Sequence, residues 1–133
     1  MNKIEHIGIA VKDLQASNLL FEKLFGAPAY KEEEVASDGV KTSFFQNGPN
    51  KIELLEATNS ESPIAKFIEK KGEGIHHIAF DVTDIVAEIA RLEKEGFVVL
   101  NSVPKKGADN KWVAFLHPKS TNGVLIELCQ EII

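Results

Sequence analysis

Apolar and polar residues alternate in two stretches that begin the two halves of the chain. Residues 3–11 and 75–82 are rich in Ile, Val and Phe at every second position. The alternating apolar residues are Ile7, Ile9, Val11, Ile78, Phe80 and Val82. A period of two is typical of a β-strand, because successive side chains point to opposite faces of the sheet. Each stretch therefore predicts a strand with one apolar face.

A helix is predicted after each of these strands. Asp13 and Asp84 are suitable N-cap residues, and Gly26 and Gly96 are suitable stops. Between these caps, apolar residues recur at helical spacing. They are Ala16, Leu19, Leu20 and Leu24 in the first helix and Val86, Ile89 and Ala90 in the second. A third helix is predicted between the halves, with Ser62 as its N-cap, Pro63 as its first residue and Gly72 as its end.

Further strands complete each half. They are predicted at residues 28–31, 40–46 and 51–56, and at residues 97–101, 111–116 and 124–129. Each half is therefore expected to be β-α-β-β-β. We predict an α+β fold made of two tandem modules in a single domain. The modules cover residues 1–58 and 74–133, and the helix at residues 62–72 connects them.

Composition narrows the class of protein. The chain has 133 residues, 44% hydrophobic and 26% charged, which is typical of one compact soluble domain. No apolar run approaches the ~20 residues that a membrane helix needs, and the first residues lack the apolar core of a signal peptide. Cys129 is the single cysteine, so no internal disulfide is expected. These features favour the cytoplasm. The net charge of −5 argues against binding to nucleic acid or to an anionic membrane.

Four polar residues repeat with the modules. His6 and His77 lie in the first strands, and Glu53 and Glu127 lie in later strands. The histidines are 71 residues apart (77 − 6) and the glutamates 74 (127 − 53). Strand alternation puts each of them on the face opposite its large apolar neighbours. A buried charge without a partner is costly, so we expect the four side chains to meet at a metal ion.

Two other histidines are less suitable as ligands. His76 has the opposite alternation to His77 and is expected on the other face of its strand. His117 precedes Pro118 in a predicted turn, where we expect a structural role or a place at the rim of the site.

The repeated module with His, Glu, His and Glu resembles the glyoxalase, or vicinal oxygen chelate, superfamily over nearly the whole chain. More specific stretches resemble the methylmalonyl-CoA epimerase family. They are residues 62–67, 74–78, 105–107, 117–120 and 123–128. The resemblance implies a cupped mixed sheet and one divalent metal ion held by His6, Glu53, His77 and Glu127. Mixed imidazole and carboxylate ligation suits Co, Ni, Mn, Fe or Zn.

The implied reaction is epimerisation of methylmalonyl-CoA by proton abstraction at C2 through a metal-stabilised enolate. Glu127 is the first candidate base and Glu53 the second. Lys105, Lys106 and Lys119, together with Lys111, are candidates for binding the phosphates of coenzyme A. Phe44, Phe45, Trp112 and Phe115 are candidates for lining the pocket, although aromatic residues in strands more often belong to the core. A homodimer is expected from the resemblance.

The chain departs from the epimerase pattern at two positions. Some family members have Gln where this chain has Glu53, and Glu53 agrees with the glyoxalase I pattern. Some members also carry a Glu shortly after the Gly39-Val40 pair, where this chain has Lys41 and Thr42. The second proton-transfer group therefore stays open. Two alternative functions also stay open: a lactoylglutathione lyase with the same ligands, and a non-catalytic protein that binds a small molecule.

Overall fold

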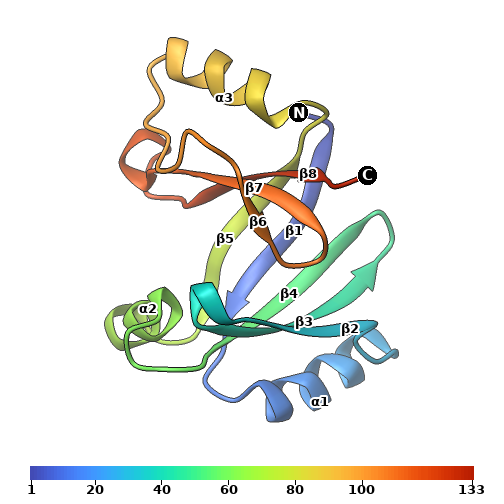
Figure 1. The fold of residues 1–133 in the computed structure, drawn as a ribbon. Helices are drawn as coiled ribbons and strands as arrows, with labels where there is room; N and C mark the ends of the chain where they lie inside the picture. The colour runs from blue at the N-terminus through green and yellow to red at the C-terminus, as the bar shows by residue number, and fades with distance from the viewer. The chain divides into compact units, whose positions relative to one another are not determined.

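The structure is a computed structural model that describes residues 1–133. The chain divides into two compact units. We call His6–His76 the N-terminal unit, and Met1–Glu5 together with His77–Ile133 the C-terminal unit. Figure 1 shows the elements along the chain. They are β1 (Lys3–Ala10), α1 (Leu14–Phe25), β2 (Lys31–Val35), β3 (Val40–Asn47), β4 (Asn50–Ala57), α2 (Pro63–Lys71), β5 (Gly74–Asp81), α3 (Ile85–Lys94), β6 (Lys105–Gly107), β7 (Lys111–Leu116) and β8 (Ile126–Glu131).

The two units repeat the same strand order. In the N-terminal unit the order is β2-β3-β4-β1, and in the C-terminal unit it is β6-β7-β8-β5. The first strand of each module runs parallel to the last, β1 to β4 and β5 to β8, whereas the other neighbours are antiparallel. The predicted α+β fold with mixed β-α-β-β-β modules is therefore confirmed.

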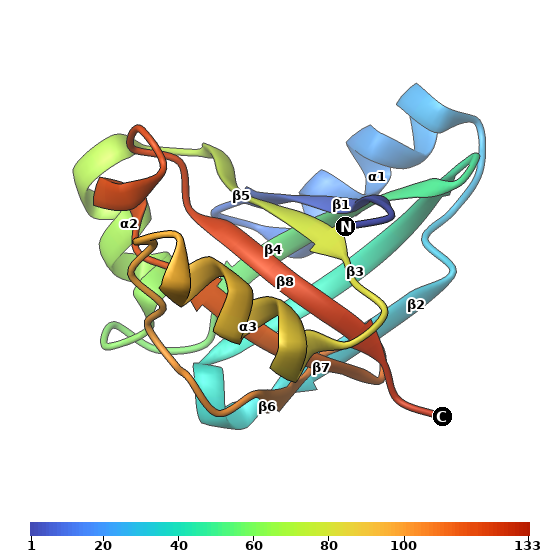
Figure 2. The same ribbon diagram turned by 90° about the horizontal axis from the view of Figure 1, so that it is seen from above.

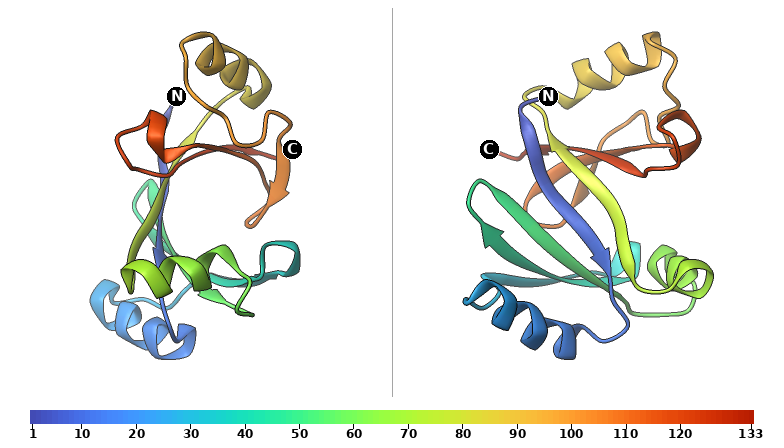
Figure 3. Two further views of the ribbon diagram at one scale, coloured as in Figure 1. Left: turned by 90° about the vertical axis from the view of Figure 1, so that its left-hand side faces the viewer. Right: turned by 180° about the vertical axis from the view of Figure 1, so that it is seen from behind.

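Helix α1 covers one face of the N-terminal unit's sheet (Figures 1 and 3). Its predicted caps are confirmed: the Asp13 side chain accepts a hydrogen bond from the Ala16 N–H at 3.0 Å, and Gly26 ends the helix at φ 75°. The apolar residues at helical spacing, Ala16, Leu19, Leu20 and Leu24, are exposed. The residues that pack on the sheet are Leu14, Phe21 and Phe25, against Val11, Phe45 and Leu54. The aromatic rings of Phe21 and Phe25, and not the leucines, therefore form the packing face of α1.

Helix α2 closes one end of the opposite face of this sheet. Its Ile64 packs against Ala10, Val40 and Leu55. The predicted N-cap is confirmed, since the Ser62 hydroxyl accepts a hydrogen bond from the Ile64 N–H at 3.1 Å. Neither helix thus covers the middle of the sheet face opposite α1.

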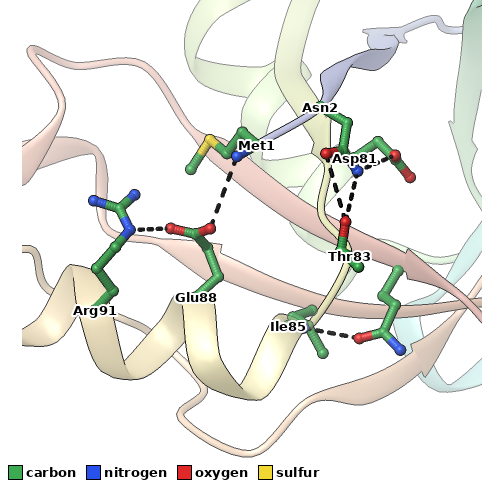
Figure 4. Close-up of polar contacts among 8 residues, drawn as sticks. Met1, Asn2, Asp81, Thr83, Ile85, Glu88 and Arg91 are labelled. Carbon is green, nitrogen blue, oxygen red and sulfur yellow. Dashed lines mark hydrogen bonds and ion pairs between the residues drawn. The ribbon is translucent and has the colours of Figure 1, made fainter.

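Helix α3 lies along β7 and β8 in the C-terminal unit (Figure 2). Its buried residues are Ile85, Ile89 and Leu92, whereas Val86 and Ala90 are exposed. Figure 4 shows that Met1 and Asn2 also join this unit. The Met1 amino group lies 3.8 Å from Glu88, and the Asn2 amide donates to Asp81 at 2.9 Å. None of the helices is long and apolar enough to cross a membrane.

Three predicted strands are displaced. The strand expected at residues 28–31 is instead Lys31–Val35, an edge strand of charged residues that carries no apolar alternation. The last strand begins at Ile126 and not at residue 124. Residues 97–101 form no strand beyond a bridge from Val99 to Leu116. Backbone hydrogen bonds join Val98 to His117 and Leu100 to Phe115, and the Asn101 side chain continues this pairing along β7.

Candidate active site

A buried histidine and a buried glutamate meet in the N-terminal unit. The Nε2 atom of His6 lies 3.3 Å from Oε1 of Glu53. They come from the adjacent parallel strands β1 and β4, in which Gly8 is the register partner of Glu53. His6 is two residues before Gly8, so both side chains lie on the face opposite α1. Gly8 therefore places no side chain beside the carboxylate.

The C-terminal unit contains the equivalent pair. The Nε2 atom of His77 lies 3.3 Å from Oε1 of Glu127. The strands are β5 and β8, and here the small residue Ala79 is the register partner of Glu127. All four side chains are at least nine-tenths buried. The two halves of the chain thus build the same His–Glu arrangement from equivalent pairs of strands.

A phenylalanine accompanies each pair. Phe44 is the partner of Glu53 across β3 and β4, and Phe115 is the partner of Glu127 across β7 and β8. Each phenylalanine ring packs edge to face on its histidine. The ring centroids are 6.4 Å apart for Phe44 and His6, and 6.1 Å apart for Phe115 and His77. Phe44 therefore lies on the same face of its sheet as His6, and Phe115 on the same face as His77. Phe45 belongs to the core beneath α1, and Trp112 is partly exposed.

The donor set fits a divalent metal ion. Two donors bound to one ion at about 2.0–2.2 Å, separated by about 90–110°, lie about 3–3.5 Å apart. The 3.3 Å separation in each pair falls in this range. Imidazole nitrogen and carboxylate oxygen are ligands for first-row transition metals. Each His–Glu pair is therefore spaced as two neighbouring ligands of one ion would be.

Thr42 has a buried hydrogen-bond partner that the sequence pattern did not indicate. Its hydroxyl donates a hydrogen bond to Oε2 of Glu53 at 2.9 Å, and the residue is only 1% exposed. Thr42 and Glu53 lie on neighbouring strands, displaced by two residues in register. The alternation of β3 places Thr42 and Phe44 on one face, but only the register between β3 and β4 puts the hydroxyl beside the carboxylate.

The remaining histidines have other partners. His76 lies edge to face with Phe67 of α2 at 5.0 Å between ring centroids. His117 caps the 3₁₀ turn Pro118–Ser120, since its Nδ1 accepts a hydrogen bond from the Lys119 N–H at 3.0 Å. These contacts agree with the expectation that His76 lies on the other face of its strand from His77. They also agree with a structural role for His117.

The candidate phosphate-binding lysines do not share one face. Lys105 is the partner of Val113, and Lys106 is the partner of Trp112, so their side chains leave β6 in opposite directions. Lys119 lies in the turn after β7. Lys111 is buried, on the same face of β7 as Val113 and Phe115. Lys105 and Lys111 are therefore the basic residues on the face that carries Glu127.

Comparison with known proteins agrees with this architecture. An ethylmalonyl-CoA/methylmalonyl-CoA epimerase of Cereibacter sphaeroides is 42% identical, covering 98% of each chain. A Streptomyces coelicolor methylmalonyl-CoA epimerase, solved with 2-nitronate-propionyl-CoA, is 34% identical with a TM-score of 0.93. The alignment covers 98% of this chain and 95% of that one. An epimerase solved with methylmalonyl-CoA and NH4+ has the same identity, coverage and TM-score.

These relatives confirm the expected kinship with methylmalonyl-CoA epimerases and the expected enzyme class, an isomerase. A family model described as "Glyoxalase/Bleomycin resistance protein/Dioxygenase superfamily" matches residues 5–115, most of the chain. The chain therefore belongs to the glyoxalase, bleomycin resistance protein and dioxygenase superfamily.

Proposed function

We propose that this protein epimerises methylmalonyl-CoA by removing and returning the proton at C2. The observation that carries the proposal is the buried His–Glu pair that each half builds in the same register, in a chain related to these epimerases. A structural relative bound to methylmalonyl-CoA supports an acyl-CoA substrate. We further propose that residues 1–133 act as one domain, as a homodimer in the cytoplasm.

We propose that His6, Glu53, His77 and Glu127 together hold one divalent ion. The donor types and the 3.3 Å separation within each pair support this ligand set. When bound, a divalent ion supplies Lewis-acid stabilisation of the negative charge that develops on the substrate, worth several kcal/mol of barrier. Phe44 and Phe115 pack edge to face against the imidazoles of His6 and His77.

Glu127 is our candidate for the base. Its carboxylate takes the proton from C2, the C–H electron pair moves toward the thioester oxygen, and the substrate becomes planar at C2. Return of a proton to the opposite face inverts the centre, which requires a second group on that side. Glu53 is the second carboxylate of the set and the candidate for that group. Among the candidates Lys105, Lys106 and Lys119, we propose that Lys105, which lies on the face that carries Glu127, binds the phosphates of coenzyme A.

The test couples metal analysis to hydrogen exchange. Purified protein is analysed for bound metal, and methylmalonyl-CoA is incubated with it in D2O while NMR follows deuterium entering C2. We expect bound divalent metal and exchange at C2 with inversion. Metal-free protein with full exchange would contradict the metal requirement, and absence of exchange in metal-loaded protein would contradict the epimerase proposal.

The presence of Glu53 favours one alternative function. A glutamate at this position agrees with the glyoxalase I pattern, so the alternative reaction is isomerisation of a glutathione hemithioacetal. The same protein is assayed with the hemithioacetal of methylglyoxal and glutathione. Turnover of this substrate without exchange of methylmalonyl-CoA would replace the epimerase by the lyase, and turnover of neither would favour a binding protein.

A further inference from the structure

The two glutamates have different neighbours although the two halves repeat. Across the strand pair, Glu53 is opposite Phe44 and Glu127 is opposite Phe115. Two residues before each phenylalanine, on the same face, the N-terminal unit has Thr42 and the C-terminal unit has Val113. Threonine and valine have nearly the same shape, but only threonine has a hydroxyl. The repeat is therefore broken by one hydrogen-bonding group.

The hydroxyl of Thr42 divides the two oxygens of Glu53 between two partners. Oε2 accepts the Thr42 hydrogen bond at 2.9 Å, while Oε1 lies 3.3 Å from Nε2 of His6. A hydrogen bond to an ionised carboxylate is stronger than one between neutral groups, and both residues are buried. Rotation of the carboxylate would break this bond, so the hydroxyl favours the orientation in which Oε1 faces His6.

A buried hydroxyl also needs an acceptor, because burying it without one is costly. Valine at position 42 would fill the same space without this cost, as Val113 does in the other half. The neighbouring strand residue Ser43 points to the other face and bonds to Asn18 at 2.5 Å. Thr42 is therefore the hydroxyl of β3 that is directed to the face with His6 and Glu53.

We propose that Thr42 is a positioning residue, which holds Glu53 as a fixed ligand of the divalent ion by presenting Oε1 beside His6. This inference rests on the proposed metal-dependent function. The equivalent residue in the other half, Val113, carries no hydroxyl, so this hydrogen bond is specific to the N-terminal unit. Glu53 is then a ligand of fixed orientation, and Glu127 remains the first candidate base.

The test compares Thr42→Val, Thr42→Ser and Ser43→Ala with the wild type. Cobalt affinity is measured by competition with a chromophoric chelator, and the visible absorption of the bound Co2+ reports its ligand geometry. Removal of a hydrogen bond that orients a ligand typically weakens metal binding about 10- to 100-fold. We expect that loss and an altered spectrum for Thr42→Val, with Thr42→Ser within about threefold of the wild type.

Ser43→Ala is the matched control, because it removes a buried hydroxyl from the same strand on the other face. We expect it to lower the melting temperature while the cobalt affinity stays unchanged. Equal losses of cobalt affinity in Thr42→Val and Ser43→Ala would overturn the inference, as they would reflect general damage to β3. Wild-type affinity in Thr42→Val would also overturn it.

The metal requirement of catalysis gives an independent measurement. In Thr42→Val, the metal concentration that gives half-maximal deuterium exchange should rise by the same factor as the cobalt dissociation constant. If wild-type protein binds cobalt and exchanges deuterium but Thr42→Val behaves identically, only the role of Thr42 fails. If the wild type neither binds metal nor catalyses exchange, the proposed function itself fails.

Discussion

The Oδ1 atom of Asn101 accepts a hydrogen bond from the backbone N–H of Phe115 at 2.9 Å, although Asn101 lies outside every strand. Its Nδ2 also donates to the carbonyl of Val113 at 3.2 Å. One side-chain amide thus fills the gap along β7 between the backbone hydrogen bonds of Val98 and Leu100 and the pairing with β6. The strand that it holds carries Phe115, whose ring lies against His77.

Asn101→Ala is expected to destabilise the protein, because two backbone groups of β7 lose their partner. Each unsatisfied group costs about 1–3 kcal/mol when buried, and partial access to water here favours the lower end of that range. Urea denaturation measures the loss. Ser102→Ala, which removes an exposed hydrogen bond to Glu93, is the control and should change stability by less than about 0.5 kcal/mol. Equal effects from the two substitutions would contradict the bridging role of Asn101.

Glu127→Gln is expected to stop deuterium exchange at C2 of methylmalonyl-CoA. The amide keeps an oxygen for metal binding but is a far weaker base, so loss of at least about 100-fold is expected from general base catalysis. Glu53→Gln should retain measurable exchange, because Glu127 still removes the proton, but it should lose inversion if Glu53 is the group on the opposite face. Persistent exchange in Glu127→Gln, or complete loss in Glu53→Gln alone, would reverse the two assignments.

Removal of metal by a chelator is expected to abolish activity without unfolding the protein. The apolar clusters beneath α1 and α3 lie on the sheet faces opposite the His–Glu pairs and do not depend on them. Circular dichroism should therefore stay native-like, and added divalent metal should restore activity. His6→Ala and His77→Ala should each lower the metal content. Unchanged stoichiometry in either variant would remove that histidine from the ligand set.

Lys105 and Lys106 provide a matched pair for the coenzyme A contacts. Lys105 leaves β6 on the face that carries Val113, whereas Lys106 leaves it on the face of Trp112. If that first face binds the acyl-CoA, Lys105→Ala should raise KM about threefold to tenfold, a loss of about 1 kcal/mol. Lys106→Ala should change KM less than twofold by the same scale. Larger effects from Lys106 would place the phosphates on the opposite face.

Burial raises the pKa of the Cys129 thiol far above its ordinary value of 9.0, and the charges of Glu127 and Glu5 add to the shift. The unfolded chain therefore releases this proton at a lower pH than the folded chain does. The stability that the neutral thiol contributes is present below about pH 9 and declines as the pH rises above it.

Cys129→Ala should lower stability at pH 7, because it leaves a small cavity in the packing around Ala79 and Val113. The same variant should lose less stability than the wild type between pH 9 and pH 10.5, about the range that linkage to a thiol pKa near 9 predicts. Native protein should also resist alkylation by iodoacetamide at pH 8. Rapid alkylation, or equal pH slopes in the two proteins, would contradict a buried neutral thiol.

Local patterns were sufficient for much of the fold. Alternation identified β1 and β5 within a residue, and Asp13, Ser62 and Asp84 cap their helices as expected. Alternation also separated His77 from His76. The inward faces of the helices were less predictable, since Phe21 and Phe25 displaced Leu20 and Leu24 from the core. Helical spacing alone does not decide which of two apolar stripes on a helix packs against the sheet.

The sequence by itself thus determined the repeat, the helix caps and the two histidines and two glutamates suited to a metal, because period and capping are properties of neighbouring residues. Only the tertiary structure decided which side chains lie beside those glutamates. Phe44 and Glu53 are nine positions apart, and Phe115 and Glu127 are twelve, yet both are direct partners across a strand pair. Register depends on the loops that join the strands, so the Thr42 hydroxyl became a partner of Glu53 only when the chain was folded.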